Sequence, residues 1–252
     1  MAFDVSATAY DRFMGRYSRQ LSPQLAELAG VQEGQRALDV GCGPGALTVE
    51  LVERLGPSAV KAVDPSASFV DAIAERFPEV AVERAPAERL PFADDAFDVT
   101  LAQLVVPFMS DPVAGLREMA RVTVAGGVVG ACGWDLAGNR SPLTAFWSGV
   151  HELIPGARDE AGSTGSGEGQ LPQLFAAAGI GDVREVALPA EVMYESFDEW
   201  WEPYTYGVGP AGAYVARLDP ATRDAVRDAC RAQLGDGPLT ITARAWAATG
   251  VA

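Results

Sequence analysis

The segment ALDVGCGPGALT, residues 37–48, decides the fold of this chain. A short apolar run containing Asp39 is followed by glycines at every second position, Gly41, Gly43 and Gly45, and then by residues that favour a helix. Glycine lets a backbone take positive φ and approach a ligand closely. A strand, a glycine-rich turn and a helix in this order are typical of a nucleotide-cofactor site.

The sequence of this loop is compatible with two cofactors. It can cradle the pyrophosphate of a dinucleotide such as NAD(P), or it can wrap the amino-acid end of S-adenosylmethionine. Asp39 would repel a pyrophosphate but attract an ammonium group, and Pro44 lacks the N–H that a phosphate cradle needs. Both details favour S-adenosylmethionine, and a tight turn that binds nothing is the remaining alternative.

The composition indicates a globular protein. The 252 residues are 48% hydrophobic, which allows a sizeable core. A net charge of −15 repels nucleic acid and anionic membrane surfaces, so we expect no nucleic-acid partner and no membrane association. With three scattered cysteines and one histidine, we expect no metal site. The first residues resemble no signal peptide, which favours a cytoplasmic location, and the sequence does not indicate an oligomeric state.

Short apolar strands alternate with helical segments through the first half of the chain. Strands are expected at 36–40, 59–63, 80–83, 97–102 and 127–132, and helices at 18–29, 46–55, 67–77 and 111–122. This alternation predicts an α/β fold, a Rossmann-like, doubly wound and mostly parallel sheet. Ligands in such sheets lie beyond the carboxyl ends of the strands, where Asp39, Asp64, Gln103 and Trp134 fall.

The second half of the chain has a different pattern. Residues 155–170 form a loop rich in glycine and serine, either a mobile lid or an ordinary connection. A helix is expected at 169–178, a strand at 182–188, and a small helical cap insertion, rich in Trp and Tyr, within 190–235. Residues 239–250 alternate with period two and predict a last, antiparallel strand at the sheet edge, which completes seven strands.

Several motifs together resemble one enzyme family. LDVGCGPGALT, VDPS, AERLPFADDAFD and the strand that begins with the last of them resemble, in that order, the class I S-adenosylmethionine-dependent methyltransferases, and within them the ubiquinone and menaquinone C-methyltransferases. YDRFMGRYS at 10–18 is similar to the N-terminal segment that covers the cofactor there. The resemblance implies one domain over 1–252, with a cofactor cover at 1–30 and a cofactor-binding core at 36–135.

The resemblance also implies a set of cofactor-binding positions. In the family, the acidic residue and glycines of the loop hold the methionyl end, a second aspartate takes the ribose hydroxyls, and a backbone N–H reads the adenine ring. Pro86 stands where the family commonly has an aspartate, so one contact to the adenine amino group is missing. Carried over, the positions are Tyr10, Arg16, Asp39, Gly41, Gly43, Asp64, Pro65, Ala87, Glu88, Gln103 and Leu104.

The acceptor side is less marked in the sequence. The implied reaction is an in-line transfer of the methyl group to a small, moderately hydrophobic organic acceptor, which leaves S-adenosylhomocysteine. His151, the one imidazole of the chain, is the candidate general base, and Trp134, Trp200, Tyr204 and Tyr206 are candidates for the acceptor pocket. Two alternatives stay open: an S-adenosylmethionine-binding protein without turnover, and an NAD(P)-dependent oxidoreductase.

Overall fold

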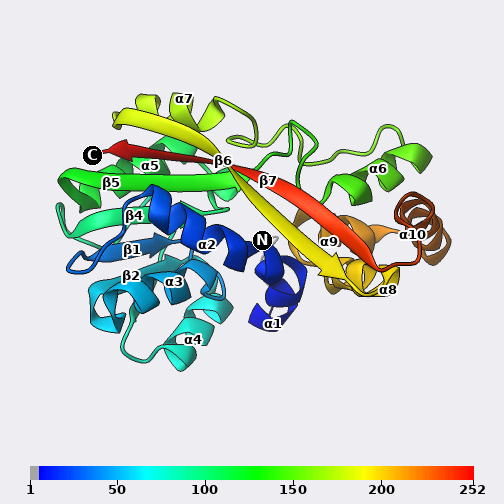
Figure 1. Cartoon of the computed structure of the whole chain (residues 1–252), viewed down its shortest axis with the longest axis horizontal. Helices are drawn as coiled ribbons and strands as arrows, with labels where there is room; N and C mark the ends of the chain where they lie inside the picture. Colours follow the sequence, from blue (N-terminus) through cyan, green and yellow to red (C-terminus); the bar gives the residue numbers. More distant parts are fainter. Residues whose placement is uncertain (1–5) are drawn as a thin grey trace.

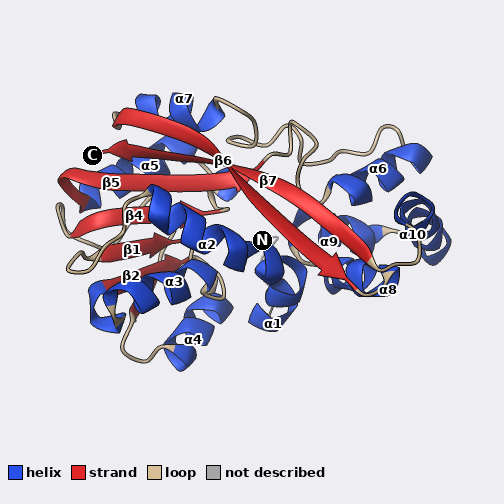
Figure 2. Cartoon of the chain, in the orientation of Figure 1, coloured by secondary structure: helices blue, strands red, loops and turns tan. Residues whose placement is uncertain are grey.

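A seven-stranded sheet with helices on both faces forms the body of the molecule (Figures 1 and 2). The structure is a computed structural model and describes residues 6–252. The strands lie in the order β3-β2-β1-β4-β5-β7-β6. Their bounds are β1 Ala37–Val40, β2 Val60–Asp64, β3 Ala81–Arg84, β4 Phe97–Gln103, β5 Thr123–Trp134, β6 Gly181–Tyr194 and β7 Leu239–Val251.

The helices follow the strands as the alternation predicts. The α-helices are α1 Ala7–Tyr10, α2 Arg16–Leu28, α3 Ala46–Leu55, α4 Ala67–Arg76, α5 Pro112–Val122, α6 Thr144–Leu153, α7 Gln170–Ala178, α8 Phe197–Trp201, α9 Gly209–Arg217 and α10 Pro220–Leu234. Buried side chains of α2, α3 and α4 pack in one core cluster, and those of α5 and α7 pack in another. The two clusters share the sheet between them, because its central strands are buried on both sides.

The predicted fold class is confirmed. The first five strands pair in parallel, and β7 pairs antiparallel with both β5 and β6. The strand predicted at 182–188 is longer than expected, because β6 runs on to Tyr194 and pairs there with Leu239 of β7. The range predicted for the cap, 190–235, therefore includes the last residues of β6.

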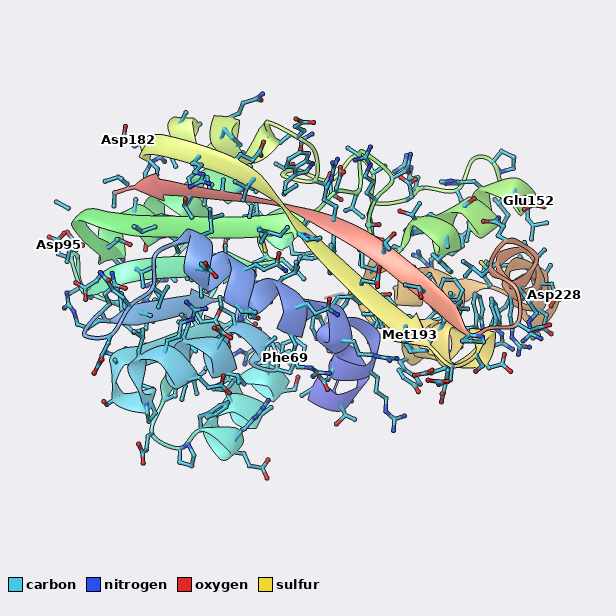
Figure 3. All side chains as sticks on the ribbon, in the orientation of Figure 1. Phe69, Asp95, Glu152, Asp182, Met193 and Asp228 are labelled. Carbon is cyan, nitrogen blue, oxygen red and sulfur yellow. The ribbon has the colours of Figure 1, made fainter. Side chains whose placement is uncertain are left out.

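Strands β6 and β7 leave the sheet as a two-stranded ribbon. The pairing of β7 with β5 ends at Trp134 and Ala245, but β6 and β7 stay paired beyond this point. Helices α8, α9 and α10 gather at the far end of the ribbon (Figure 1). Met193, labelled on the ribbon in Figure 3, is 62% exposed. The ribbon thus carries the cap away from the strand ends and leaves room between the cap and the sheet.

The N-terminal segment bridges the sheet and the cap. It consists of α1, a π-helical turn η1 at Asp11–Gly15, and α2. The side chains of Arg16, Gln20 and Gln24, each four residues apart, donate hydrogen bonds to carbonyl oxygens on the free edge of β6. Spacing of four residues puts these side chains on one face of the helix. Helix α2 therefore covers an edge strand whose backbone groups would otherwise be unpaired. Residues 1–5 of the predicted cover lie outside the described residues.

Candidate active site

The glycine loop between β1 and α3 is fastened to the end of β2. The backbone N–H groups of Gly41 and Cys42 both donate to the carbonyl oxygen of Val63. Gly41 has φ of +71°, and a Cβ there would lie 2.5 Å from Cγ2 of Val105. Gly43 also has positive φ, but the space beside it is open, with no atom within 4 Å of a Cβ placed there. The loop thus needs glycine for close packing at Gly41 and offers an open position at Gly43.

Two buried carboxyl groups, Asp39 and Asp64, flank this loop. Asp39, at 1% exposure, accepts a hydrogen bond of 2.6 Å from the hydroxyl of Thr48. Asp64 accepts from the backbone N–H of Gly43 at 2.9 Å and of Ser66 at 2.8 Å. Burial raises the pKa of Asp39 to about 7 and also raises the pKa of Asp64. Both sites therefore suit a ligand that brings a positive charge or hydrogen-bond donors.

The end of β4 carries two further candidates. The amide nitrogen of Gln103 donates to the backbone oxygen of Ser18, while its Oε1 is buried without a hydrogen-bond partner among the described residues. Leu104, which follows, has φ of +63° although it is not glycine. Backbone strain of this kind costs about 1–3 kcal/mol and gathers at functional sites. An unpaired oxygen and a strained residue thus lie together at the carboxyl end of a central strand.

The predicted adenine-binding residues follow β2 and β3. Pro65 is exposed, and its carbonyl oxygen accepts from Arg84. Ala87 is buried, and the carboxylate of Glu88 accepts hydrogen bonds from the backbone N–H groups of Ser110 and Asp111. Glu88 therefore ties this segment to the turn before α5, and its role beside an adenine stays a prediction.

The N-terminal cover brings Tyr10 to the site but directs Arg16 elsewhere. The ring of Tyr10 meets Phe69 of α4 edge to face, with 5.6 Å between centroids; Figure 3 labels Phe69. The guanidinium of Arg16 pairs with Glu199 at 2.7 Å, donates to the backbone oxygen of Met193 and lies over the ring of Tyr194. In this structure Arg16 thus joins the cover to the ribbon and cap.

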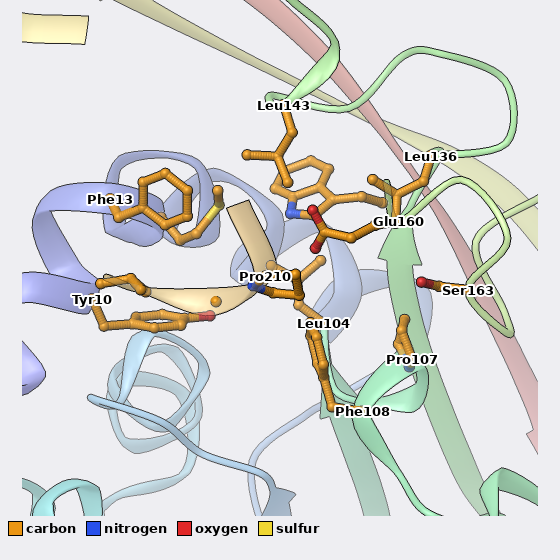
Figure 4. Close-up of a pocket in the computed structure, with 14 residues that line it drawn as sticks. Tyr10, Phe13, Leu104, Pro107, Phe108, Leu136, Leu143, Glu160, Ser163 and Pro210 are labelled. Atoms are coloured by element: carbon orange, nitrogen blue, oxygen red, sulfur yellow. The ribbon is translucent and has the colours of Figure 1, made fainter. Parts of the chain in front are cut away.

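A cavity opens beside the ends of β4 and β5, with about 570 Å³ of empty volume including its open mouth. Its wall is mostly apolar and draws on the cover, both strand ends, the 155–170 loop and the start of α9. Figure 4 shows the lining side chains, which are Tyr10, Phe13, Met14, Leu104, Pro107, Phe108, Trp134, Leu136, Leu143, Glu160, Ser163, Val208, Gly209 and Pro210.

Of the four aromatic residues predicted for the acceptor pocket, Trp134 lines this cavity. Trp200 and Tyr204 line a smaller void behind it and pack on each other with 5.0 Å between centroids. Tyr204 also stacks on Phe146 at 4.6 Å. The hydroxyl of Tyr206 accepts a hydrogen bond from Arg12. These three residues of the cap thus contact the core and the cover in this structure.

His151 lies on α6, and it is not among the residues that line the cavity. Its Nε2 is 3.1 Å from the backbone oxygen of Ala157 and 3.6 Å from the carboxylate of Asp159, and its ring stacks on Trp147. These contacts hold the histidine against the start of the 155–170 loop. Its role as the base, predicted from the sequence, is therefore without support from its position.

The cavity instead presents a carboxyl group that the sequence analysis missed. Glu160 is 8% exposed, and its Oε2 accepts a hydrogen bond of 3.0 Å from the indole N–H of Trp147. Burial is the main cause that raises the pKa of Glu160 to about 7. In the sequence, nothing separates Glu160 from Asp159 beside it or from Glu168 in the same loop. Only the fold shows which of the three acids is buried.

The cysteines offer no exposed thiol in the part of the chain that the structure describes. Cys42, Cys132 and Cys230 are free thiols that are all buried, and burial raises the pKa of the Cys42 thiol well above its ordinary value. Across residues 6–252, no cluster of three or more His, Cys, Asp or Glu side chains is arranged to hold a metal ion. No helix in the same range is long and apolar enough to cross a lipid bilayer.

Comparison with known proteins shows what the chain resembles. Residues 38–130 match the family described as "Methyltransferase domain". A demethylmenaquinone methyltransferase of Mycolicibacterium paratuberculosis is 32% identical over 153 residues, 61% of this chain and 64% of the relative. The chain therefore spans less than two thirds of that relative's length.

Solved structures agree on the fold. YcgJ from Bacillus subtilis superposes with a TM-score of 0.59 at 18% identity, covering 91% of this chain and 97% of that one. A phosphoethanolamine N-methyltransferase 2 of Haemonchus contortus, solved with S-adenosylhomocysteine, gives 0.61 at 15% identity, over 97% of this chain and 56% of that one.

The domain match and the relatives show that the chain is similar to the class I S-adenosylmethionine-dependent methyltransferases, and the solved structures agree with the fold. Within that class it resembles the ubiquinone and menaquinone C-methyltransferases. This resemblance was predicted from the motifs of residues 10–98 and the strand that begins at 97, and the comparisons confirm it.

Proposed function

We propose that this protein transfers the methyl group of S-adenosylmethionine to a small, moderately hydrophobic organic acceptor bound in the cavity of Figure 4. When bound, S-adenosylmethionine supplies an electrophilic methyl group on a positively charged sulfur. One observation carries the proposal. The cavity shares Leu104 with the cofactor-binding positions, so an acceptor in it would lie against the same strand end as the cofactor.

The residues present fit this cofactor. The buried carboxyl group of Asp39 and the unpaired Oε1 of Gln103 are acceptors that an ammonium group can satisfy. Asp64 keeps lone pairs for hydroxyl donors after accepting from Gly43 and Ser66. The open space beside Gly43 leaves room for a ligand against the loop. A dinucleotide pyrophosphate would instead meet two buried acids, which argues against NAD(P).

The apolar wall supports the hydrophobic acceptor. Most of the lining side chains are aliphatic or aromatic, and Trp134, Phe13 and Phe108 supply flat surfaces for a ring. The relative from Mycolicibacterium paratuberculosis is a methyltransferase of demethylmenaquinone. For this chain we extend that only to a class, small aromatic or enol-type acceptors.

The test begins with the thermal midpoint of the purified protein in the presence of S-adenosylmethionine, S-adenosylhomocysteine, NAD or NADP. A ligand at 100 times its Kd stabilises by about 2.7 kcal/mol, a rise of several degrees. We expect the rise with the first two ligands alone. Transfer of a labelled methyl group is then measured across a panel of phenols, catechols and quinols. A rise with the dinucleotides alone would overturn the proposal, and binding without transfer to any acceptor class would favour a protein without turnover.

A further inference from the structure

Glu160 is placed where an acceptor would lie. Its carboxyl group points into the cavity between Leu143 and Leu104 in Figure 4. Among the described residues that line this cavity, Glu160 is the one carboxyl group, and the others with polar side-chain atoms are Tyr10, Ser163 and Trp134. A carboxyl group in an apolar cavity is costly to bury, and such groups are found where chemistry requires them.

The group is held in one position. The indole N–H of Trp147, on α6, donates to Oε2 of Glu160 at 3.0 Å. No hydrogen bond from the described residues reaches the other oxygen, Oε1. The loop itself is fastened, because Ser166 is fully buried and its hydroxyl donates to the backbone oxygen of Ser163. One carboxyl oxygen is therefore fixed by the protein, and the other is left for a ligand.

The other titratable groups near Glu160 either face away from the cavity or stay protonated, so Glu160 is the base closest to an acceptor in the cavity. Asp159 precedes it and faces His151 of α6 at 3.6 Å. Tyr204 of the cap lies behind, and burial keeps the pKa of its phenol well above the ordinary value. Tyr10 of the cover lines the same cavity. No lysine or arginine side chain is among the residues that line it, in the part of the chain described.

We propose that Glu160 is the general base that takes the proton of the methyl acceptor, an inference that rests on the proposed function. The acceptor enters with its O–H or acidic C–H intact. As the acceptor atom forms its bond to the methyl carbon, the carbon–sulfur bond breaks and its electron pair stays on sulfur. The acceptor proton moves to Oε1 of Glu160 and then to solvent. The products are the methylated acceptor, S-adenosylhomocysteine and one released proton.

The positive charge of the sulfonium allows the role of Glu160 to be tested without an acceptor, through the protons released when the cofactor binds. S-adenosylmethionine carries a sulfonium, whereas the sulfur of S-adenosylhomocysteine is neutral. A positive charge near Glu160 favours its ionised form and lowers its pKa from about 7. Binding of S-adenosylmethionine at pH 6.5 should therefore release more protons than binding of S-adenosylhomocysteine, by up to about three quarters of a proton, the fraction of Glu160 that is protonated at this pH.

The first experiment measures this difference by calorimetry in buffers of different ionisation enthalpy at pH 6.5. Wild type should show the excess release, Glu160→Gln should lose it, and Glu168→Gln, the same change at an exposed site in the same loop, should keep it. Affinity for S-adenosylhomocysteine checks that each variant is folded. An excess that persists in Glu160→Gln, or no excess in wild type, overturns the inference. Failure of both ligands to bind would instead refute the proposed function.

The second experiment uses turnover. With the best phenol-type acceptor of the panel, Glu160→Gln should lower kcat by about 10²- to 10⁴-fold and remove the rise of rate toward pH 7. Trp147→Phe removes a donor that stabilises the carboxylate and should move that rise to higher pH. A nitro-substituted analogue, already ionised at the assay pH, should lose far less. Equal losses for both acceptors, or a loss in His151→Gln with none in Glu160→Gln, would overturn the assignment.

Discussion

The two walls of the site are built in different ways. The wall that we propose for the cofactor consists of strand ends and the loops that follow them. Its key groups fall within residues 39–104 and are held by hydrogen bonds such as that from the backbone N–H of Gly43 to Asp64. The wall that we propose for the acceptor consists of side chains spread along the chain from Tyr10 to Pro210. They come from strand ends, helices and loops, and the cap that contributes some of them is connected to the sheet by the ribbon of β6 and β7. The first wall is a property of the sheet, and the second is a property of the packing between the sheet and the cap.

A carboxyl group with a raised pKa occurs in both walls, but different parts of the structure bury it. Burial raises the pKa of Asp39 and of Glu160 to about 7 in each case. Asp39 is buried by the sheet itself, since it lies within β1 and bonds to Thr48 of the next helix. Glu160 is buried by a loop that folds back over the strand ends and by Trp147 of α6. Changes in the cap should thus alter the acceptor wall and leave the cofactor wall intact.

The largest expected effect tests this separation. Trp200, 2% exposed, packs against Phe197, Trp201 and Tyr204. Replacing it by alanine should cost about 3–5 kcal/mol of stability, because the cavity left behind cannot be filled. Chemical denaturation of Trp200→Ala and of the milder Trp200→Phe measures the cost. We expect Trp200→Phe to keep the acceptor KM; a large rise in KM with unchanged stability would show that Trp200 touches the acceptor instead.

The positions of the residues that we propose for the cofactor wall could be predicted from the sequence because their signals are local. Loop glycines, Asp39 and Asp64 lie close together along the chain, and strand periodicity places them at one sheet edge. The seven strands and their antiparallel end were predicted for the same reason. What the sequence did not reveal is that both carboxylate oxygens of Asp64 accept hydrogen bonds from backbone N–H groups.

The acceptor wall could not be predicted in the same way. The cap was recognised by its Trp and Tyr content, but aromatic composition does not tell which rings pack on each other and which face a cavity. His151 stood out as the one imidazole, whereas Glu160 was one of several acids in a loop without periodicity. The length of β6, set by its pairing with β7, decides where the cap lies. The extent of this pairing cannot be predicted from the sequence of one strand alone.

A smaller effect is expected at the glycine loop, where two neighbouring glycines differ. In Gly41→Ala the new methyl group would meet Val105 at 2.5 Å while the backbone keeps φ of +71°. Overlap and strain together should cost about 2–4 kcal/mol. Urea denaturation gives the stability, and titration with S-adenosylhomocysteine gives the affinity, which should also fall because the loop must shift.

Gly43→Ala is the matched control for this change. It has φ of +52° but open space beside it, so strain alone should cost about 1–2 kcal/mol. If both variants lose the same stability, close packing against Val105 is not what requires glycine at position 41. Greater loss of cofactor affinity than of stability at Gly43 would support the view that the open space there is filled by the ligand.

The smallest effect is a pH dependence that belongs to the cofactor wall alone. The folded-state pKa of Asp39 is raised to about 7, so below that pH the folded protein holds a proton that the unfolded chain has released. The usual sign for a carboxyl group is therefore reversed, and this group's contribution to stability falls as pH rises from about 4 to 7. A bound ammonium group favours the ionised form, so the affinity for S-adenosylhomocysteine should rise over the same range, by up to about tenfold per pH unit.

Titrations of S-adenosylhomocysteine between pH 5.5 and 8 measure this dependence. Asp39→Asn keeps the shape and an acceptor for Thr48, and it should bind more weakly and lose most of the slope below pH 7. The neutral sulfur of this ligand leaves Glu160 out of the linkage, so Glu160→Gln should retain the wild-type slope. If Glu160→Gln also flattened the pH dependence of affinity, Asp39 and Glu160 would titrate as a coupled pair. The two walls would then not be independent of each other.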